Sequence, residues 1–145
     1  MNLEIYNMTE YDLSLIRNVL NDDFDDFWSY DVLHEELNNP NSEYFVAKSE
    51  NNILGFAGIW KAVDDVHITD IVVKKSERQT GIGSKLLEKL IQTAKKQNFK
   101  AITLEVNEHN LPAINLYLKY NFINVGFRKK YYDNKENAII MTKDL

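Results

Sequence analysis

The chain has 145 residues, of which 44% are hydrophobic and 12% aromatic, and it contains no cysteine. This size and composition suffice for a substantial core in one domain, while the absence of cysteine excludes disulfides, thiol nucleophiles and thiolate metal sites. A net charge of -5 argues against binding along a nucleic-acid backbone, which requires an excess of lysine and arginine.

Nothing in the sequence is typical of a membrane span, a targeting signal or a second domain. The apolar runs are much shorter than the roughly 18 residues that a span needs, and no repeat or linker interrupts the chain. We therefore predict a single cytoplasmic domain, residues 1–145, with neither a membrane nor a nucleic-acid partner. The histidines, His34, His67 and His109, are too dispersed along the sequence for a metal site.

The first forty residues predict one strand followed by two helices. Leu3–Tyr6 has the composition of a short strand. Thr9 is placed to cap the first helix, with Asp12 near the third helical position, and Ser29 is placed to cap the second, which should stop before Pro40. The apolar positions are Leu13, Ile16 and Leu20 in the first helix and Val32, Leu33 and Leu37 in the second.

The middle of the chain predicts a hairpin, a further strand and a long amphipathic helix. Glu43–Lys48 and Ile53–Trp60 are β-rich runs separated by a turn-prone Ser-Glu-Asn-Asn segment, and Val66–Val73 forms the next strand. From Ser84 to about Gln97, apolar residues recur at helical spacing. These residues are Leu86, Leu87, Leu90, Ile91 and Ala94.

The last third contains, in order, a strand, a short helix and two more strands: Ala101–Val106, Asn110 or Leu111 to Tyr120, Ile123–Tyr132 and Asn137–Thr142. Because a helix connects Val66–Val73 to Ala101–Val106, these two strands should be parallel, whereas the hairpins at both ends of the chain are antiparallel. The sequence therefore predicts an α/β (α+β) fold with a mixed, mostly antiparallel central sheet flanked by helices.

A glycine-containing turn joins the strand Val66–Val73 to the long helix. From Arg78 to Gly83 it reads Arg-Gln-Thr-Gly-Ile-Gly. Glycines allow backbone N–H groups to point at a phosphate without an obstructing Cβ, and the start of the following helix adds unsatisfied N–H groups and a positive dipole end. The turn therefore predicts a phosphate-binding loop, although a strand, turn and helix without any ligand have the same pattern.

In their common order, four features of the chain resemble the GNAT superfamily of acetyl-CoA-dependent N-acetyltransferases. They are Arg78-x-x-Gly81-x-Gly83 after a strand, Leu104-Glu105-Val106, Asn110 with Tyr117 seven residues later, and the Tyr131-Tyr132 tail. The strand and the tail are most similar to the RimI-type enzymes. The resemblance implies a single-domain GNAT fold in which the two parallel strands splay apart.

The resemblance also implies how acetyl-CoA, the co-substrate, is held without a metal. The backbone of Ile71, Val72 and Val73 would pair with the pantetheine arm, and Asn110 would contact that arm. The pyrophosphate would lie on the main-chain N–H groups of Gln79, Thr80, Gly81, Ile82, Gly83 and Ser84. From the residues alone, the strand segment is equally an ordinary core strand, and Asn110 before Pro112 is equally a helix N-cap.

By resemblance, Glu105 matches the general base of the family and Tyr117 its general acid. An α-amino group with a pKa of roughly 7.7–8.0 needs only a modest base, and a phenol with a pKa of about 10 can protonate a thiolate. Direct transfer is expected, since no cysteine is present to form an acyl-enzyme. From the residues alone, Glu105 can also be a solvated or salt-bridged strand residue, and Tyr117 a core aromatic with a paired hydroxyl.

The RimI-type resemblance implies that the acceptor is a protein N-terminal α-amine, the alanine of ribosomal protein S18. Trp28, Tyr131 and Tyr132 would flank the peptide groove, and the acidic run 22–26 either attracts the amine or is a solvated loop. The chain departs from the family pattern at Phe27, Asn107 and His109. Two alternatives remain: a GNAT enzyme acting on a lysine side chain, polyamine or drug, and a catalytically silent CoA-binding module.

Overall fold

A mixed seven-stranded sheet organises the part of the chain that the computed structural model describes, residues 2–25, 28–132 and 136–145, with side chains except at 130–132. The strands lie in the order β1-β2-β3-β4-β5-β7-β6. Only β4 and β5 are parallel to one another, and every other neighbouring pair is antiparallel. The predicted mixed, mostly antiparallel sheet is confirmed. The strands are β1 Leu3–Asn7, β2 Ser42–Ser49, β3 Asn52–Lys61, β4 Asp65–Val73, β5 Ala101–Asn107, β6 Ile123–Tyr132 and β7 Glu136–Asp144.

The helices cover both faces of this sheet, and each face has its own apolar core. On β2, Phe45 and Ala47 belong to the core under α3 and α4, whereas Tyr44 and Val46 belong to the core under the N-terminal helical segments. This alternation follows from the two-residue period of a strand. The helical segments are α1 Glu10–Leu15, the π-helical turn η1 Leu20–Phe24, α2 Tyr30–Leu37, the 3-10 turn η2 Lys75–Glu77, α3 Ile82–Lys96 and α4 Leu111–Lys119.

The capping predictions at the N-terminus are confirmed. The Thr9 side chain accepts a hydrogen bond from Asp12 N–H, and the Asp12 carboxylate accepts one from Thr9 N–H. Ser29 caps α2. The first helix is shorter than its apolar spacing indicates, because α1 ends at Leu15 and Leu20 lies in the separate turn η1. Near that end the Ser14 hydroxyl donates to Tyr11 O at 2.6 Å, a local bond that competes with helix continuation.

Helix α3 begins at Ile82, two residues before the Ser84 start that the sequence indicates. Its N-cap is Gly81, which has a left-handed backbone with φ of 90° and no side chain to signal a cap. The Lys85 N–H donates to Gly81 O at 3.1 Å, which closes the first helical turn. The second glycine of the loop, Gly83, therefore lies inside the first turn of the helix. The predicted apolar stripe of α3 is confirmed as core.

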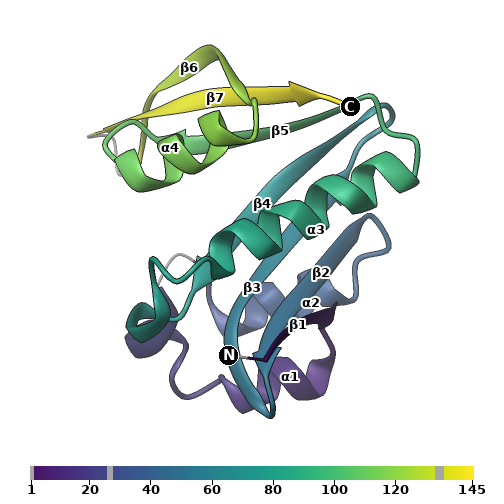
Figure 1. Cartoon of the computed structure of the whole chain (residues 1–145), viewed down its shortest axis with the longest axis vertical. Helices are drawn as coiled ribbons and strands as arrows, with labels where there is room; N and C mark the ends of the chain where they lie inside the picture. Colours follow the sequence, from purple (N-terminus) through teal and green to yellow (C-terminus); the bar gives the residue numbers. More distant parts are fainter. Residues whose placement is uncertain (1, 26–27, 133–135) are drawn as a thin grey trace.

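The parallel strands β4 and β5 are paired over only three residues each, Asp65–His67 with Ala101–Thr103. Beyond these pairs they separate. Figure 1 shows them meeting near the C-terminus and diverging, with α4, β6 and β7 beside β5 and the other strands beside β4. The divergence opens the sheet between the end of β4 that leads into the glycine loop and the start of α4.

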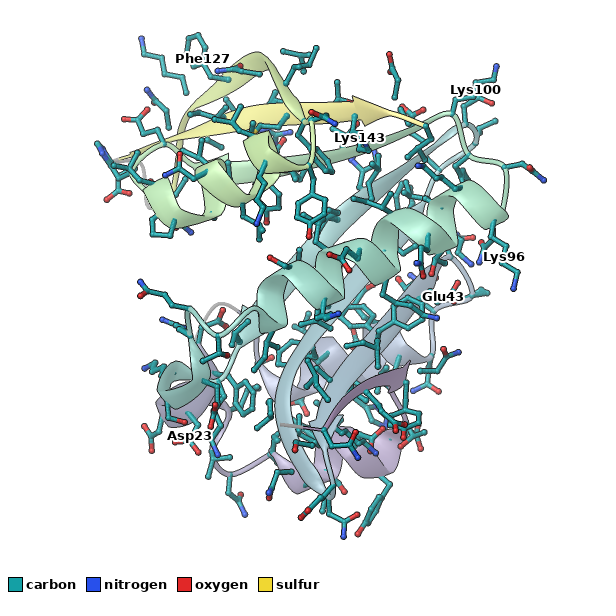
Figure 2. All side chains as sticks on the ribbon, in the orientation of Figure 1. Asp23, Glu43, Lys96, Lys100, Phe127 and Lys143 are labelled. Atoms are coloured by element: carbon teal, nitrogen blue, oxygen red, sulfur yellow. The ribbon has the colours of Figure 1, made fainter. Side chains whose placement is uncertain are left out.

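The last strand in the sheet order, β6, is an edge strand that carries exposed apolar side chains. Ile123, Val125 and Phe127 are all more than half exposed, and Figure 2 shows Phe127 at the periphery of the molecule. Along its inner edge, β6 is hydrogen-bonded to β7, which in turn pairs with β5. This arrangement places the C-terminal hairpin next to the strand that carries Glu105.

Candidate active site

Two contiguous cavities occupy the opening between β4 and β5. One has a volume of about 450 Å³ and is lined by β4, β5, α4 and the segment that precedes α2. The other has a volume of about 600 Å³ and is lined by the end of β4, the glycine loop and α4. We call them the acceptor cavity and the donor cavity, after the roles that the resemblance implies for Glu105 and for the glycine loop. Both cavities are lined by Asp25, Ile71, Asn110, Ala113 and Tyr117.

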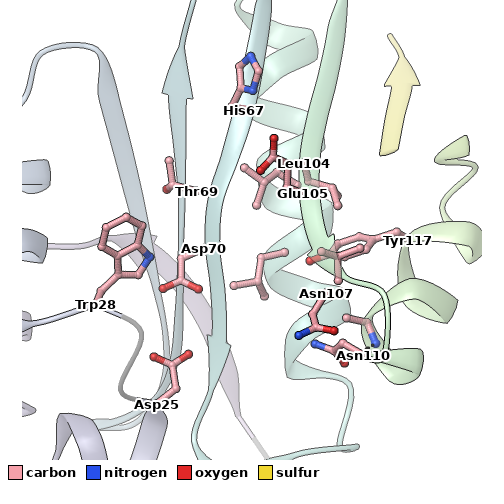
Figure 3. Close-up of a pocket in the computed structure, with 14 residues that line it drawn as sticks. Asp25, Trp28, His67, Thr69, Asp70, Leu104, Glu105, Asn107, Asn110 and Tyr117 are labelled. Atoms are coloured by element: carbon pink, nitrogen blue, oxygen red, sulfur yellow. Dashed lines mark hydrogen bonds between the residues drawn. The ribbon is translucent and has the colours of Figure 1, made fainter. Parts of the chain in front are cut away.

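Glu105 lines the acceptor cavity from β5, on the strand face opposite its buried neighbours Leu104 and Val106. Its carboxylate forms an ion pair with Arg128 on β6, with Oε1 to Nη2 at 2.8 Å. Arg128 reaches it across β7, where the small residue Ala138 stands opposite Arg128 in the strand register. The salt-bridged reading of Glu105 is therefore correct, and the same carboxylate also faces the cavity (Figure 3).

Tyr117 lines both cavities from α4 and is buried, with 8% exposure. Its ring packs against Phe122 with centroids 5.6 Å apart and belongs to the core on the α3 side. The core-aromatic reading and the catalytic one are compatible, because packing fixes the ring at the junction of the two cavities. Figure 3 shows Tyr117 and Glu105 on the same side of the acceptor cavity.

The acceptor cavity also contains two aspartates: Asp25, which belongs to the acidic run that the sequence analysis named, and Asp70, which the sequence analysis did not select. Asp70 lies on β4, and Asp25 lies just after η1; in Figure 3 their carboxyl groups point toward one another. Burial raises the pKa of Asp70 well above its ordinary value, and the Asp25 carboxylate raises it further. Within the described part of the chain, Asp70 Oδ2 is buried without a hydrogen-bond partner.

The glycine loop forms one wall of the donor cavity. Gln79 and Gly81 both have positive φ angles, 64° and 90°, and a Cβ built on Gly81 would meet nothing within 4 Å. Because the first helical bond runs from Lys85 to Gly81, the three residues that open α3 present N–H groups without partners earlier in the helix. These N–H groups and the helix dipole make a site suited to an anion.

Most of the residues expected at the co-substrate site line the donor cavity. They are Ile71, Val72, Val73, Gln79, Gly81, Gly83, Ser84 and Asn110. Two are not among its lining residues. The Thr80 hydroxyl donates to Glu77 O at 2.5 Å, and Ile82 packs in the core with 1% exposure. If these two residues contribute, they do so through the backbone.

Asn110 is the N-cap of α4, so that prediction is confirmed: Oδ1 accepts the Ala113 N–H at 3.3 Å, and Pro112 lies in the first turn. The residue also lines both cavities. Asn107, one of the departures from the family pattern, is held at the end of β5. Its side chain donates to the Glu136 carboxylate and accepts the His109 N–H.

Arg78 holds the loop to distant segments. Its Nη2 donates to Phe24 O at 3.0 Å and its Nε to Val73 O at 3.2 Å. These bonds join η1 and the end of β4 to the loop. The arginine of the motif thus links the segment that carries Asp25 to the wall of the donor cavity.

The expected acceptor-binding aromatics are only partly described. Trp28 lines the acceptor cavity beside Asp70 (Figure 3). Tyr131 and Tyr132 lie on β6, and their side chains fall outside the described residues, as does Phe27. Across the residues with described positions, no group of three or more histidine, aspartate or glutamate side chains is placed to hold a metal ion, and no helix is long and apolar enough to cross a membrane.

Comparison with known proteins identifies a family and several relatives. A family model described as "Acetyltransferase (GNAT) family" matches residues 13–122. A Bacillus subtilis protein, provisionally named a ribosomal protein bS18-alanine N-acetyltransferase, is 34% identical over 139 residues, which cover 94% of this chain and 92% of the relative. The ribosomal protein bS18-alanine N-acetyltransferase of Haemophilus influenzae is 34% identical over 120 residues, covering 79% of this chain and 80% of the relative.

A solved structure has the same fold over nearly the whole chain. The ribosomal-protein-S18-alanine N-acetyltransferase of Escherichia coli superposes with a TM-score of 0.88 and 26% identity, covering 98% of this chain and 93% of that one. The fold predicted from the sequence agrees with this neighbour in architecture and extent.

Proposed function

The chain belongs to the GNAT family of acetyltransferases, and from that premise we propose that it transfers the acetyl group of acetyl-CoA to a protein N-terminal α-amine, the alanine of ribosomal protein bS18. The observation that carries the proposal is the meeting of two cavities at Tyr117, one walled by a phosphate-binding loop and the other containing Glu105. The names of the relatives support the choice of acceptor. A ribosomal acceptor places the reaction in the cytoplasm.

The donor cavity fits the CoA moiety in its shape and its polar groups. The open space beside Gly81 admits a phosphate, which the backbone N–H groups at the start of α3 can bind. The β4 edge at Ile71–Val73 has no β5 partner and is available to pair with the extended pantetheine arm. Bound acetyl-CoA supplies the acetyl thioester at the junction of the cavities.

Glu105 acts as the general base. Its carboxylate takes a proton from the acceptor amine, directly or through a water, as the amine nitrogen attacks the acetyl carbonyl. The ion pair with Arg128 restrains this side chain at the edge of the cavity, so that its position does not depend on the acceptor. The demand on the base is modest, because an α-amine is partly neutral near pH 7.

Tyr117 acts as the general acid. Its hydroxyl donates a proton to the sulfur that departs when the thioester bond breaks. The ring is buried against Phe122 and borders both cavities, which places the proton donor between donor and acceptor. Trp28 on one side and Tyr131 with Tyr132 on the other are assigned to the walls of the peptide groove.

The test is incubation of the full chain with acetyl-CoA and a peptide that has the N-terminal sequence of ribosomal protein bS18. Mass spectrometry with fragmentation should locate one added acetyl group on the α-amine of the first alanine. A second peptide, with a blocked α-amine and a free lysine, serves as the matched control and should remain unmodified. Acetylation of the lysine alone would contradict the assignment of the acceptor, and no transfer to either amine would contradict the assignment as this enzyme.

A further inference from the structure

Asp70 is a half-buried acid at the acceptor side of the active site, and within the described residues one of its carboxyl oxygens has no hydrogen-bond partner. Its Oδ2 atom is buried and, within the described residues, accepts no hydrogen bond. Among the described residues, the backbone N–H of Ile71 favours its charged form. A carboxyl in this condition costs folding free energy, and an apolar or amide side chain of similar size would avoid that cost. A carboxyl oxygen that is buried without a partner in the wall of a cavity is a candidate for binding a ligand.

The backbone around Asp70 is built to hold the carboxyl in the cavity. The register of β3 and β4 shifts there, with Gly58 opposite Asp70 but Ile59 opposite Ile68, so that Thr69 is an extra residue. Such a bulge re-aims the neighbouring side chains. The Thr69 hydroxyl is hydrogen-bonded to the Tyr44 hydroxyl at 2.9 Å.

Tyr44 fixes this bulge from β2, which lies two strands away from β4 in the sheet. Its ring occupies the space over Gly58, where an added Cβ would lie 2.3 Å from a ring carbon. Tyr44 is itself buried, with 5% exposure. The segment that carries Asp70 is therefore a rigid part of the cavity wall, which is the placement that a binding group requires.

We infer that Asp70 is the anchor for the positively charged amine of the acceptor, which it binds beside Trp28 and opposite Glu105 before the proton is removed. This inference rests on the proposed function and names the group that recognises the acceptor. Three observations support it: the unpartnered oxygen, the bulge that fixes it and the second carboxyl of Asp25 facing it. Together these carboxyl groups match an ammonium, which has three donors and a positive charge.

The proton balance of this step follows from the burial of Asp70. In the free protein, burial and the Asp25 carboxylate raise the pKa of Asp70 and favour its protonated form. An ammonium beside it favours the carboxylate, so the carboxyl proton leaves to solvent as the acceptor binds. No covalent bond to carbon forms or breaks in this step. The ammonium later loses one proton to solvent and becomes the neutral amine, and the proton released as that amine attacks goes to Glu105.

Other titratable groups near Asp70 come from each element packed around it. They are Asp25 after η1, Tyr44 on β2, His67 on β4, Glu105 with Arg128 on β5 and β6, and Tyr117 on α4. The carboxylates outnumber the cations on this wall, so an acceptor with aspartate or glutamate as its first residue should be disfavoured by repulsion. The predicted acceptor class is an α-ammonium next to a small uncharged side chain.

Asp70→Asn tests the inference, because it keeps the shape and removes the charge. We expect the KM for an alanine-starting peptide to rise about 10- to 100-fold, the range for losing a hydrogen bond to a charged group, while the KM for acetyl-CoA stays unchanged. Asp144→Asn is the matched control, since Asp144 is exposed and lies outside both cavities. It should leave both constants unchanged. An unaltered peptide KM in Asp70→Asn would overturn the inference.

A measurement on the unaltered protein gives an independent test. Calorimetric titration of the alanine-starting peptide, with CoA present, in two buffers of different ionisation enthalpy should reveal release of up to one proton per bound peptide. The same peptide lacking the α-amino group should bind about 10- to 100-fold more weakly and release none. Equal affinity of the two peptides would also overturn the inference.

The outcomes separate this inference from the proposed function. If the unaltered protein acetylates no α-amine, the proposed function is wrong. If it does so and Asp70→Asn matches it in peptide KM, only the role of Asp70 is wrong. Should Asp70→Asn fold poorly, as judged by thermal unfolding, the calorimetric comparison of the two peptides decides.

Discussion

Substitution of Glu105 by glutamine should separate catalysis from folding in this protein. The change removes the carboxylate that faces the acceptor cavity and keeps the side-chain shape. Loss of a positioned general base lowers a rate by about 10²- to 10⁴-fold. We expect kcat for an alanine-starting peptide to fall by this amount, with little change in the affinity for acetyl-CoA, because Glu105 does not line the donor cavity.

The cost in stability should be small, because the ion pair with Arg128 is largely solvated. At the observed separation of 2.8 Å, two unit charges in water attract by about 1.5 kcal/mol. The Arg128 side chain is 58% exposed, so screening and side-chain entropy reduce the net contribution to less than about 1 kcal/mol. For a chain of this size that corresponds to a fall in Tm of no more than about 4 °C.

The assay is steady-state acetyl transfer combined with thermal unfolding. Arg128→Ala is the informative companion, because it breaks the same ion pair and leaves the carboxylate in place. Its effect on kcat should be much smaller than that of Glu105→Gln, while the two variants should lose similar stability. If both lose kcat equally, the ion pair and not the base is what matters. If Glu105→Gln retains full kcat, the assignment of the base is wrong.

Three further changes probe the loop, the cap and the buried acid. Gly81→Ala forces a Cβ onto a backbone with φ of 90°, so it should lower the free energy of unfolding by about 1–2 kcal/mol and weaken acetyl-CoA binding. Gly126→Ala is the control: a Cβ there has its nearest neighbour at 3.9 Å, so neither quantity should change. Equal acetyl-CoA affinity in the two variants would contradict the loop assignment. Asn110→Ser keeps the helix cap and should preserve the free energy of unfolding, whereas Asn110→Ala should lower it by about 0.5–2 kcal/mol. Both variants should weaken acetyl-CoA binding. Normal acetyl-CoA affinity in Asn110→Ser would show that Asn110 acts only as a helix cap. Because the pKa of Asp70 is raised on folding, its contribution to stability is present at low pH and is lost as the pH rises through the folded-state pKa, at about 1.4 kcal/mol per pH unit. Asp70→Asn should therefore be more stable than the unaltered protein at pH 8 and equal to it below about pH 4 in denaturant titrations; a constant difference would contradict the burial argument.

The elements of the fold were largely predictable because their signals are local. Apolar spacing, capping side chains and turn residues located every strand and most helices within a few residues. The start of α3 was placed too late because its cap, Gly81, acts through its backbone conformation and not through a side chain. The π-helical turn η1 was missed, since its formation depends on packing of Leu20 and Phe24 against the sheet.

The parts of the site that sequence reasoning missed depend on contacts between distant segments. In the sequence, Asp70 looks like an ordinary polar residue of a strand. Only in the folded chain do the bulge and the side chains of Trp28 and Asp25 surround it. Arg78 donates a hydrogen bond to the carbonyl of Phe24, 54 residues away in the sequence. Arg128 forms an ion pair with Glu105 from two strands away in the sheet. No local pattern encodes these pairs, whereas the glycine loop and the cap at Asn110 are local.

Because β4 and β5 pair over only a short stretch, one half of the site is built mainly from backbone groups and the other mainly from side chains. In the proposed mechanism, donor binding uses backbone groups at the unpaired β4 edge and the start of α3, and these depend on the course of the chain more than on side-chain identity. Acceptor binding is proposed to use the side chains of Trp28, of Asp70 on β4 and of Glu105 on β5. Substitutions at Trp28 or Asp70 can change the acceptor without disturbing the donor site, because these side chains line only the acceptor cavity. Asp70 fits this division, because the cost to stability of its buried carboxyl oxygen falls on the half of the site that we propose sets specificity. Of the two proposed catalytic groups, only Tyr117 lines both cavities.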